Sequence, residues 1–195
     1  LQFGAFEFLE VTKKFIDNFE NKILYVMEAF EKCKYEDAST VLNEITIDDE
    51  NEATVRILRG NILYATHHQW RAVCEYEIAY NLYLKTSTKF LHLPALRCAQ
   101  WYLHEIKNIT KARRYFHYCC KNFATFNSWN GFGVVNLMEA SYKRAESCFL
   151  QANQIYNNSG ENWLNLALVN CKLGHFGIAL ECYMAAKSCG DADTK

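Results

Sequence analysis

A repeated pattern runs through residues 126–186, which read FNSWNGFGVVNLMEASYKRAESCFLQANQIYNNSGENWLNLALVNCKLGHFGIALECYMAA. Five kinds of position recur in it at a spacing of 34: a tryptophan, a small residue, an alanine, an aromatic residue and a second alanine. The matching pairs are Trp129 and Trp163, Gly133 and Ala167, Ala145 and Ala179, Phe149 and Tyr183, and Ala152 and Ala186. Two unrelated helices would not keep five positions in register, so the sequence indicates an internal repeat.

The pattern extends toward the N-terminus at nearly the same spacing. The first of the two alanines recurs at residues 38, 72, 112, 145 and 179. The longest interval in this series contains Leu82 to Pro94, where we expect an extended helix or a longer loop. We interpret each unit as two antiparallel helices that stack on the next unit, because one unit cannot bury its apolar faces alone. Small residues are expected where the two helices approach closely, at Gly60, Ala99, Gly133 and Ala167, and aromatics between neighbouring units, at Tyr76, Phe116, Phe149 and Tyr183.

These residues resemble the tetratricopeptide repeat (TPR). The resemblance implies an all-α solenoid of helix-turn-helix repeats, wound as a right-handed superhelix. We predict a partial helix of a preceding repeat at 1–18, about five repeats at 19–52, 53–91, 92–125, 126–159 and 160–190, and a tail at 191–195. We also expect the chain to be part of something longer, because it begins inside an amphipathic pattern and without methionine.

Composition disfavours several functional classes. Of the 195 residues, 50% are apolar and 22% are charged, which is typical of a folded domain. Lys and Arg number 21 against 22 Asp and Glu, whereas nucleic-acid binding needs a clustered basic excess. The sequence has neither an uncharged apolar run long enough to span a membrane nor the basic start of a signal peptide. We therefore expect a cytoplasmic protein whose partners are other proteins, with no nucleic acid, membrane or small-molecule substrate.

The histidines and cysteines, which could bind a metal or act in catalysis, lack the spacing that such sites require. The histidine pairs His67–His68 and His104–His117 do not have the i, i+3 or i+4 spacing of metal ligands on a helix. The nine cysteines form no C-x-x-C pair, so we interpret them as buried reduced thiols, with a disulfide framework or a zinc site as the alternative. We predict no catalytic residue, no cofactor and no metal, and hence no enzyme.

The first helices of the repeats are expected to line a concave groove, and positions 2, 5, 9 and 12 of each unit give its residues. The predicted groove consists of Ile57, Asn61, Tyr64, Leu96, Gln100, Leu103, Asn130, Val134, Leu137, Leu164 and Leu168. A groove for a C-terminal carboxylate would present Lys or Arg instead, so we expect an apolar helix or extended segment of a partner. Asn61, Gln100 and Asn130 would bind its backbone. The alternative is that curvature or an adjoining repeat covers several of these positions.

Two further groups of residues have both a structural and a functional interpretation. Asn136 and Asn170 occupy equivalent positions, and we expect a hydrogen bond between repeats; contact with a partner backbone is the alternative. A basic cluster around the third turn is interpreted as solvated surface, with an acidic partner such as a tubulin tail as the alternative. Its members are Lys107, Lys111, Arg113, Arg114 and Lys121.

Some details of residues 126–186 go beyond the general repeat pattern. They are the start at 128–134, SWNGFGV, and the turn at 157–159, NNS. These details are similar to the C-terminal repeats of cilia- and flagella-associated TPR proteins. The resemblance implies a structural or regulatory component of the motile axoneme, within the cytoskeleton of a cilium or flagellum. Our hypothesis is therefore a non-enzymatic scaffold of that kind; the alternatives are a scaffold of another cytosolic assembly, or the regulatory repeats of a larger enzyme.

Overall fold

A computed structural model describes residues 19–48, 51–86 and 91–192 of the chain, and every regular element in these ranges is an α-helix. The helices belong to two compact units, α2 to α5 in the first and α6 to α11 in the second. Each unit is built from antiparallel helix pairs, which makes the protein an all-α helical-repeat solenoid. The predicted partial helix at 1–18 lies outside the described residues.

The first unit contains α2 (Phe19–Glu31), α3 (Tyr35–Asn43), α4 (Glu52–Ala65) and α5 (Gln69–Thr86). The second contains α6 (His92–His104), α7 (Ile109–Asn122), α8 (Phe126–Met138), α9 (Tyr142–Ile155), α10 (Gly160–Leu173) and α11 (Phe176–Ala192). The five helix pairs lie close to the five predicted repeat ranges, although α4 begins at Glu52, the last residue of the first range, and α11 reaches into the segment predicted as a tail. The long interval in the alanine series is explained by α5, which extends over 18 residues.

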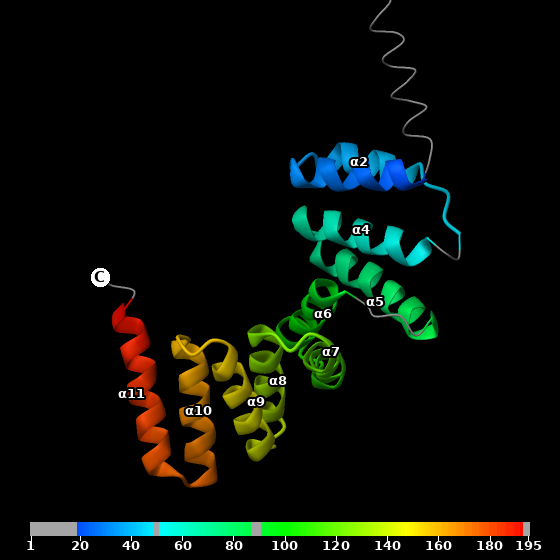
Figure 1. Cartoon of the computed structure of the whole chain (residues 1–195). Helices are drawn as coiled ribbons and strands as arrows, with labels where there is room; N and C mark the ends of the chain where they lie inside the picture. Colours follow the sequence, from blue (N-terminus) through cyan, green and yellow to red (C-terminus); the bar gives the residue numbers. More distant parts are fainter. Residues whose placement is uncertain (1–18, 49–50, 87–90, 193–195) are drawn as a thin grey trace, which may run out of the picture. The chain divides into compact units, whose positions relative to one another are not determined.

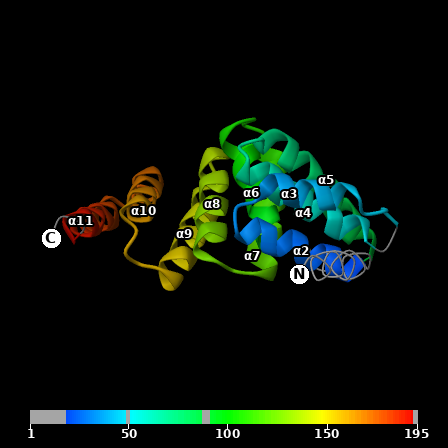
Figure 2. The same cartoon turned by 90° about the horizontal axis from the view of Figure 1, so that it is seen from above.

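Within the second unit, each helix packs against the next one along the chain, as Figures 1 and 2 show for α8 beside α9 and α10 beside α11. The first helices of consecutive repeats also touch, α6 with α8 and α8 with α10. A surface formed by α6, α8 and α10 is therefore continuous within this unit.

A residue with left-handed backbone closes the turn inside every helix pair. These residues are Cys33, His67, Lys107, Ala140 and Gly174, with φ of 57°, 63°, 56°, 55° and 81°. Each lies five residues before the alanine that marks its repeat. In four of the turns the following N–H donates to the carbonyl five residues back, as from Ser141 to Asn136 at 2.9 Å, which is the Schellman closure of a helix end. The left-handed turn residue therefore recurs at the same position of every described repeat, as the buried alanine does.

Polar caps begin the first helices of the last two repeats. The Thr125 hydroxyl accepts a hydrogen bond from the backbone N–H of Ser128 before α8. In the same way the Ser159 hydroxyl accepts from Asn162 N–H at 3.3 Å before α10. Each cap satisfies one of the otherwise unpaired donors of a helix start.

Close packing around the glycines and alanines holds the helix pairs together. Ala145 is fully buried in a core with Phe149 and Leu166. Gly133 faces Phe149 of its own repeat, and a Cβ added there would lie 2.5 Å from the ring Cε1, which confirms the predicted close approach. The comparable core of the first unit contains Val26, Leu42 and Val55. In the same unit, an ion pair between Arg56 and Glu75, 3.0 Å apart, joins α4 to α5.

Two packing predictions are wrong. Tyr76, Phe116 and Phe149 are buried as predicted, but Tyr183 is 53% exposed because no described helix covers its side of α11. The buried amides of Asn136 and Asn170 do not join repeats: they donate to the carbonyls of Phe132 and Leu166, one turn back in their own helices, at 2.7 and 3.0 Å. A helix carbonyl one turn away is always within reach of such an amide, whereas a partner across the stack has to be placed by packing.

Candidate protein-binding face

The predicted groove residues divide into buried and accessible groups. Ile57, Leu96 and Leu103 are each exposed by 5% or less and lie in the core, so they offer no surface to a partner. Asn61 accepts a hydrogen bond from the Tyr76 hydroxyl at 2.9 Å, and Tyr64 is half-buried. The three first-unit residues, Ile57, Asn61 and Tyr64, are thus mainly internal.

The accessible residues lie in the second unit. Leu164 and Leu168 occupy successive turns of α10 and are 48% and 46% exposed. Asn130 and Val134 stand 34 residues earlier on α8, at the equivalent positions, and are half-buried. Because α8 and α10 pack against one another, helical periodicity places these four side chains on one surface.

Residues beside these four extend or support that surface. Leu137 continues the α8 row and, like Val134, is half-buried and packs against the core around Phe149. Gln100 is exposed on α6, which contacts α8. We call Gln100, Asn130, Val134, Leu164 and Leu168 the first-helix face.

One exposed residue next to this face was not predicted. Leu93 is exposed and lies two turns before Gln100 on α6. Leu93 lies in the interval from Leu82 to Pro94, where an extended helix or a longer loop was expected, and α6 begins within it at His92. The i, i+7 spacing to Gln100 is the signal that would have identified it.

The first-helix face also contains an unpaired polar atom. Asn130 Oδ1 is shielded from solvent and accepts no hydrogen bond from any described residue. A buried carbonyl oxygen without a donor is unfavourable by about 1–3 kcal/mol.

The buried thiols near this surface are not reactive nucleophiles, whereas Cys171, expected to be buried, is exposed on α10 one turn beyond Leu168. Burial raises the pKa of Cys119 to about 12 and that of Cys148 to about 11, so both remain protonated at neutral pH. Burial also raises the pKa of Cys120. Uncharged thiols at these positions behave as small apolar core residues.

A histidine and two hydroxyls meet at the start of α8. His92 Nε2 lies 3.2 Å from Ser128 Oγ and 3.1 Å from Thr125 Oγ1. Ser128 is fully buried, so its hydroxyl is closed to any substrate. Burial lowers the pKa of His92, which favours the neutral ring. This network ties the start of α6 to the cap of α8.

In the described part of the chain no three His, Cys, Asp or Glu residues gather as metal ligands would.

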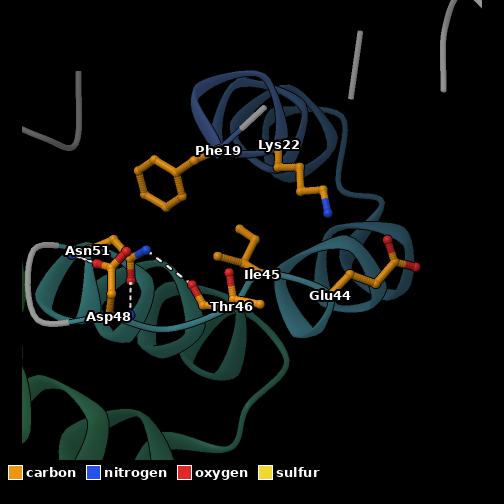
Figure 3. A pocket seen from close by; sticks show the side chains of 7 residues that line it. All are labelled: Phe19, Lys22, Glu44, Ile45, Thr46, Asp48 and Asn51. Carbon is orange, nitrogen blue, oxygen red and sulfur yellow. Dashed lines mark hydrogen bonds between the residues drawn. The ribbon is translucent and has the colours of Figure 1, made fainter. Parts of the chain in front are cut away.

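A cavity of about 470 Å³ belongs to the first unit (Figure 3). It is lined by Phe19, Lys22, Glu44, Ile45, Thr46, Asp48 and Asn51. The Asn51 side chain is already engaged, because it donates to Thr46 O at 3.1 Å and accepts from Asp48 N–H at 3.0 Å. These bonds join Asn51 at the start of α4 to Thr46 and Asp48.

The predicted basic cluster is partly paired inside the protein. Lys111 Nζ donates to the Tyr102 hydroxyl at 2.9 Å, and Arg113 forms an ion pair with Glu139. Fewer free cations therefore remain for an acidic partner.

No described helix is both long and apolar enough to cross a bilayer.

Comparison with solved structures identifies the fold. YrrB, described as a TPR protein with an unusual peptide-binding site, superposes with a TM-score of 0.76 at 14% identity, over 93% of this chain and 91% of that one. A structure of MamA gives 0.66 at 16% identity, over 87% and 94%. The chain has the fold of tetratricopeptide-repeat proteins.

Curated proteins add a resemblance over part of this chain. Human cilia- and flagella-associated protein 70 is 28% identical over 117 residues, which is 60% of this chain. The Macaca fascicularis protein of the same name is 32% identical over 84 residues, or 43% of this chain. The aligned part amounts to 10% of the human protein and 8% of the macaque protein. No family model matches the sequence.

Proposed function

We propose that this TPR chain is a non-enzymatic scaffold, and that the first-helix face of its second unit binds an apolar segment of another protein. The observation that carries the proposal is the pair Leu164 and Leu168, about half exposed on successive turns of α10. Exposed apolar side chains grouped on one face are typical of interaction sites. A helix or extended segment with leucine-sized residues would remove both from water.

The polar residues of the same face suggest how the segment is oriented. Asn130 has an acceptor without a donor, and the Gln100 side chain is exposed on α6. Both amides can bind backbone groups of any sequence, while the leucines select apolar side chains. The proposed partner is therefore recognised by its apolar pattern more than by its charge.

The resemblance to cilia- and flagella-associated protein 70 supports a place for this scaffold in the cytoplasm of a cilium or flagellum. We propose a structural or regulatory role in the motile axoneme, with other axonemal proteins as partners. The chain spans about a tenth of the human protein, so this assignment concerns the role of one repeat segment.

The test is a pull-down from ciliated-cell extract with wild type and with the double variant Leu164→Asp/Leu168→Asp. The substituted side chains are about half exposed, so the variant should fold, which circular dichroism checks. We expect it to lose the partners that wild type retains, because two carboxylates would be desolvated in the interface. Ile155→Asp, at an exposed position of α9, is the control. If the folded double variant kept every partner at wild-type levels, the first-helix face would not be the binding surface.

A further inference from the structure

A second apolar surface lies on α11 and has no role in the scaffold function proposed above. Phe176, Leu180, Tyr183 and Met184 follow one another at i, i+4, i+7 and i+8, so they share one side of the helix. Their exposed fractions are 72%, 62%, 53% and 58%. We call these four residues the α11 stripe. The other side of α11, with Ala179, Cys182 and Ala186, is buried.

In the preceding second helices, the aromatic position equivalent to Tyr183 is covered. Phe149, 34 residues before Tyr183, is fully buried in a core shared by α9 and α10. Phe116, the equivalent of α7, contacts Gly131 of α8 so closely that the glycine has no room for a Cβ. Among the described helices, none covers the corresponding position of α11.

The composition of α11 also differs from that of α9. Leu180 stands where α9 has Glu146, and Ile178 stands where α9 has Arg144. Glu181 is the only charged residue between positions 176 and 184, and helical spacing places it beside the stripe rather than within it. A helix that is apolar on both sides is normally buried on both sides.

We propose that the α11 stripe is a dimer interface and that its occupant is the α11 stripe of a second copy of this chain. The two helices pack antiparallel about a two-fold axis at Leu180. This places Leu180 against its own copy, Phe176 against Tyr183, and Met184 against Gly177. The pairing is self-complementary, because every contact is made twice, as a two-fold interface requires.

The side chains suit this arrangement. Two Phe176–Tyr183 ring pairs form, and such pairs add about 0.5–1.5 kcal/mol each beyond the buried area. Met184 fills the space over Gly177, where a side chain would meet no atom within 4 Å. At roughly 100–150 Å² for each stripe residue, two copies bury about 1,000 Å², the lower end for a specific interface. We therefore expect micromolar affinity.

Sedimentation velocity of the full chain over a concentration series tests the dimer. We expect a monomer–dimer equilibrium for wild type, and dimerisation weakened at least roughly tenfold by Leu180→Glu, which sets two carboxylates against each other on the axis. Leu150→Glu is the matched control, because Leu150 is an exposed leucine of α9 at the repeat position of Met184. Its dimerisation should equal that of wild type. A wild type that stays monomeric, or two variants that weaken dimerisation equally, would overturn the proposal.

Disulfide trapping tests the two-fold geometry separately. Leu180→Cys should form a covalent dimer under mild oxidation, because residue 180 meets its own copy. Leu150→Cys and wild type, treated alike, give the background from the native thiols. Dimerisation without trapping through residue 180 would exclude the antiparallel pairing. If the chain stayed monomeric and bound a different protein through the α11 stripe, the stripe would not be a dimer interface. Neither result depends on Leu164 or Leu168, so failure here and failure of the proposed scaffold function are distinguishable.

Discussion

At Gly133 the backbone of α8 lies against the ring of Phe149, which is fully buried and has no space to move into. The contact depends on the absence of a side chain at this one position. Gly131, two residues earlier, has the same relation to Phe116 of the preceding repeat. The two glycines therefore serve different interfaces: Gly133 closes its own helix pair, and Gly131 closes the stack between pairs.

Gly133→Ala should destabilise the protein although alanine is the better helix former. Overpacking costs about 1–3 kcal/mol and the gain in helix propensity is about 1 kcal/mol, so we expect the free energy of unfolding to fall by about 1 kcal/mol. Gly177→Ala is the control, because a Cβ there meets no atom within 4 Å. It should leave stability unchanged or raise it slightly. Urea denaturation of dilute protein measures both, and equal effects at the two positions would contradict the packing described for α8.

The sequence predicted the role of the small residues better than that of the groove residues. Gly133 and Ala145 have few alternatives to close packing, so their repetition identifies them. Leucine is ambiguous, since it suits the core and a binding face equally. Leu103 is buried on α6 while Leu168 is half exposed on α10, and their side chains are identical. What separates them is the set of neighbouring helices, which the local pattern does not contain.

At the scale of the helix pair, the left-handed turn residue was not foreseen. A glycine is the usual signal for such a turn, and it is present at Gly174 but absent from Cys33, His67, Lys107 and Ala140. These four side chains adopt left-handed backbone at a cost of about 1–2 kcal/mol each. The helices on either side impose this conformation, and so packing prevails over local preference.

Ala140→Gly should therefore stabilise the protein. Glycine removes the left-handed penalty but adds flexibility to the unfolded chain, which leaves a net gain of about 0.5–1 kcal/mol. Gly174→Ala is the reciprocal change at the equivalent turn and should lower the free energy of unfolding by a similar amount. Both values come from the same urea denaturation curves. A loss of stability on Ala140→Gly would argue against the positive φ at that turn.

At the scale of the whole molecule, repetition identified the fold and the helix pairs, because a 34-residue period constrains every repeat at once. It did not identify the division into two units between residues 90 and 91. That division depends on which helices share contacts, and the alanine register continues through it without a break except for the longer interval. The repeat pattern does not predict the binding partner either, because partner binding depends on exposed residues, and these can differ from one repeat to the next.

The cysteines, spread over both units, allow the whole fold to be probed in one experiment. Cys33 and Cys171 are exposed, whereas Cys98, Cys119, Cys120, Cys148 and Cys182 are buried. We expect a thiol-alkylating reagent to modify the exposed pair quickly in the native protein, because burial withholds the other thiols and raises the pKa of Cys119 to about 12. Mass spectrometry of digested samples over a time course follows each site.

The order in which the buried cysteines react reports how the solenoid opens. Each repeat is stabilised by its neighbours, so the terminal helix of a stack opens more readily than a central one. Cys182 lies on α11, which packs against α10 alone among the described helices, while Cys119 lies on α7 between α6 and α8. In dilute protein Cys182 should therefore react before Cys119, and low concentrations of urea should widen the difference. If the two reacted together, the second unit would open in one cooperative step rather than from its end, and the nearest-neighbour account of its stability would be wrong.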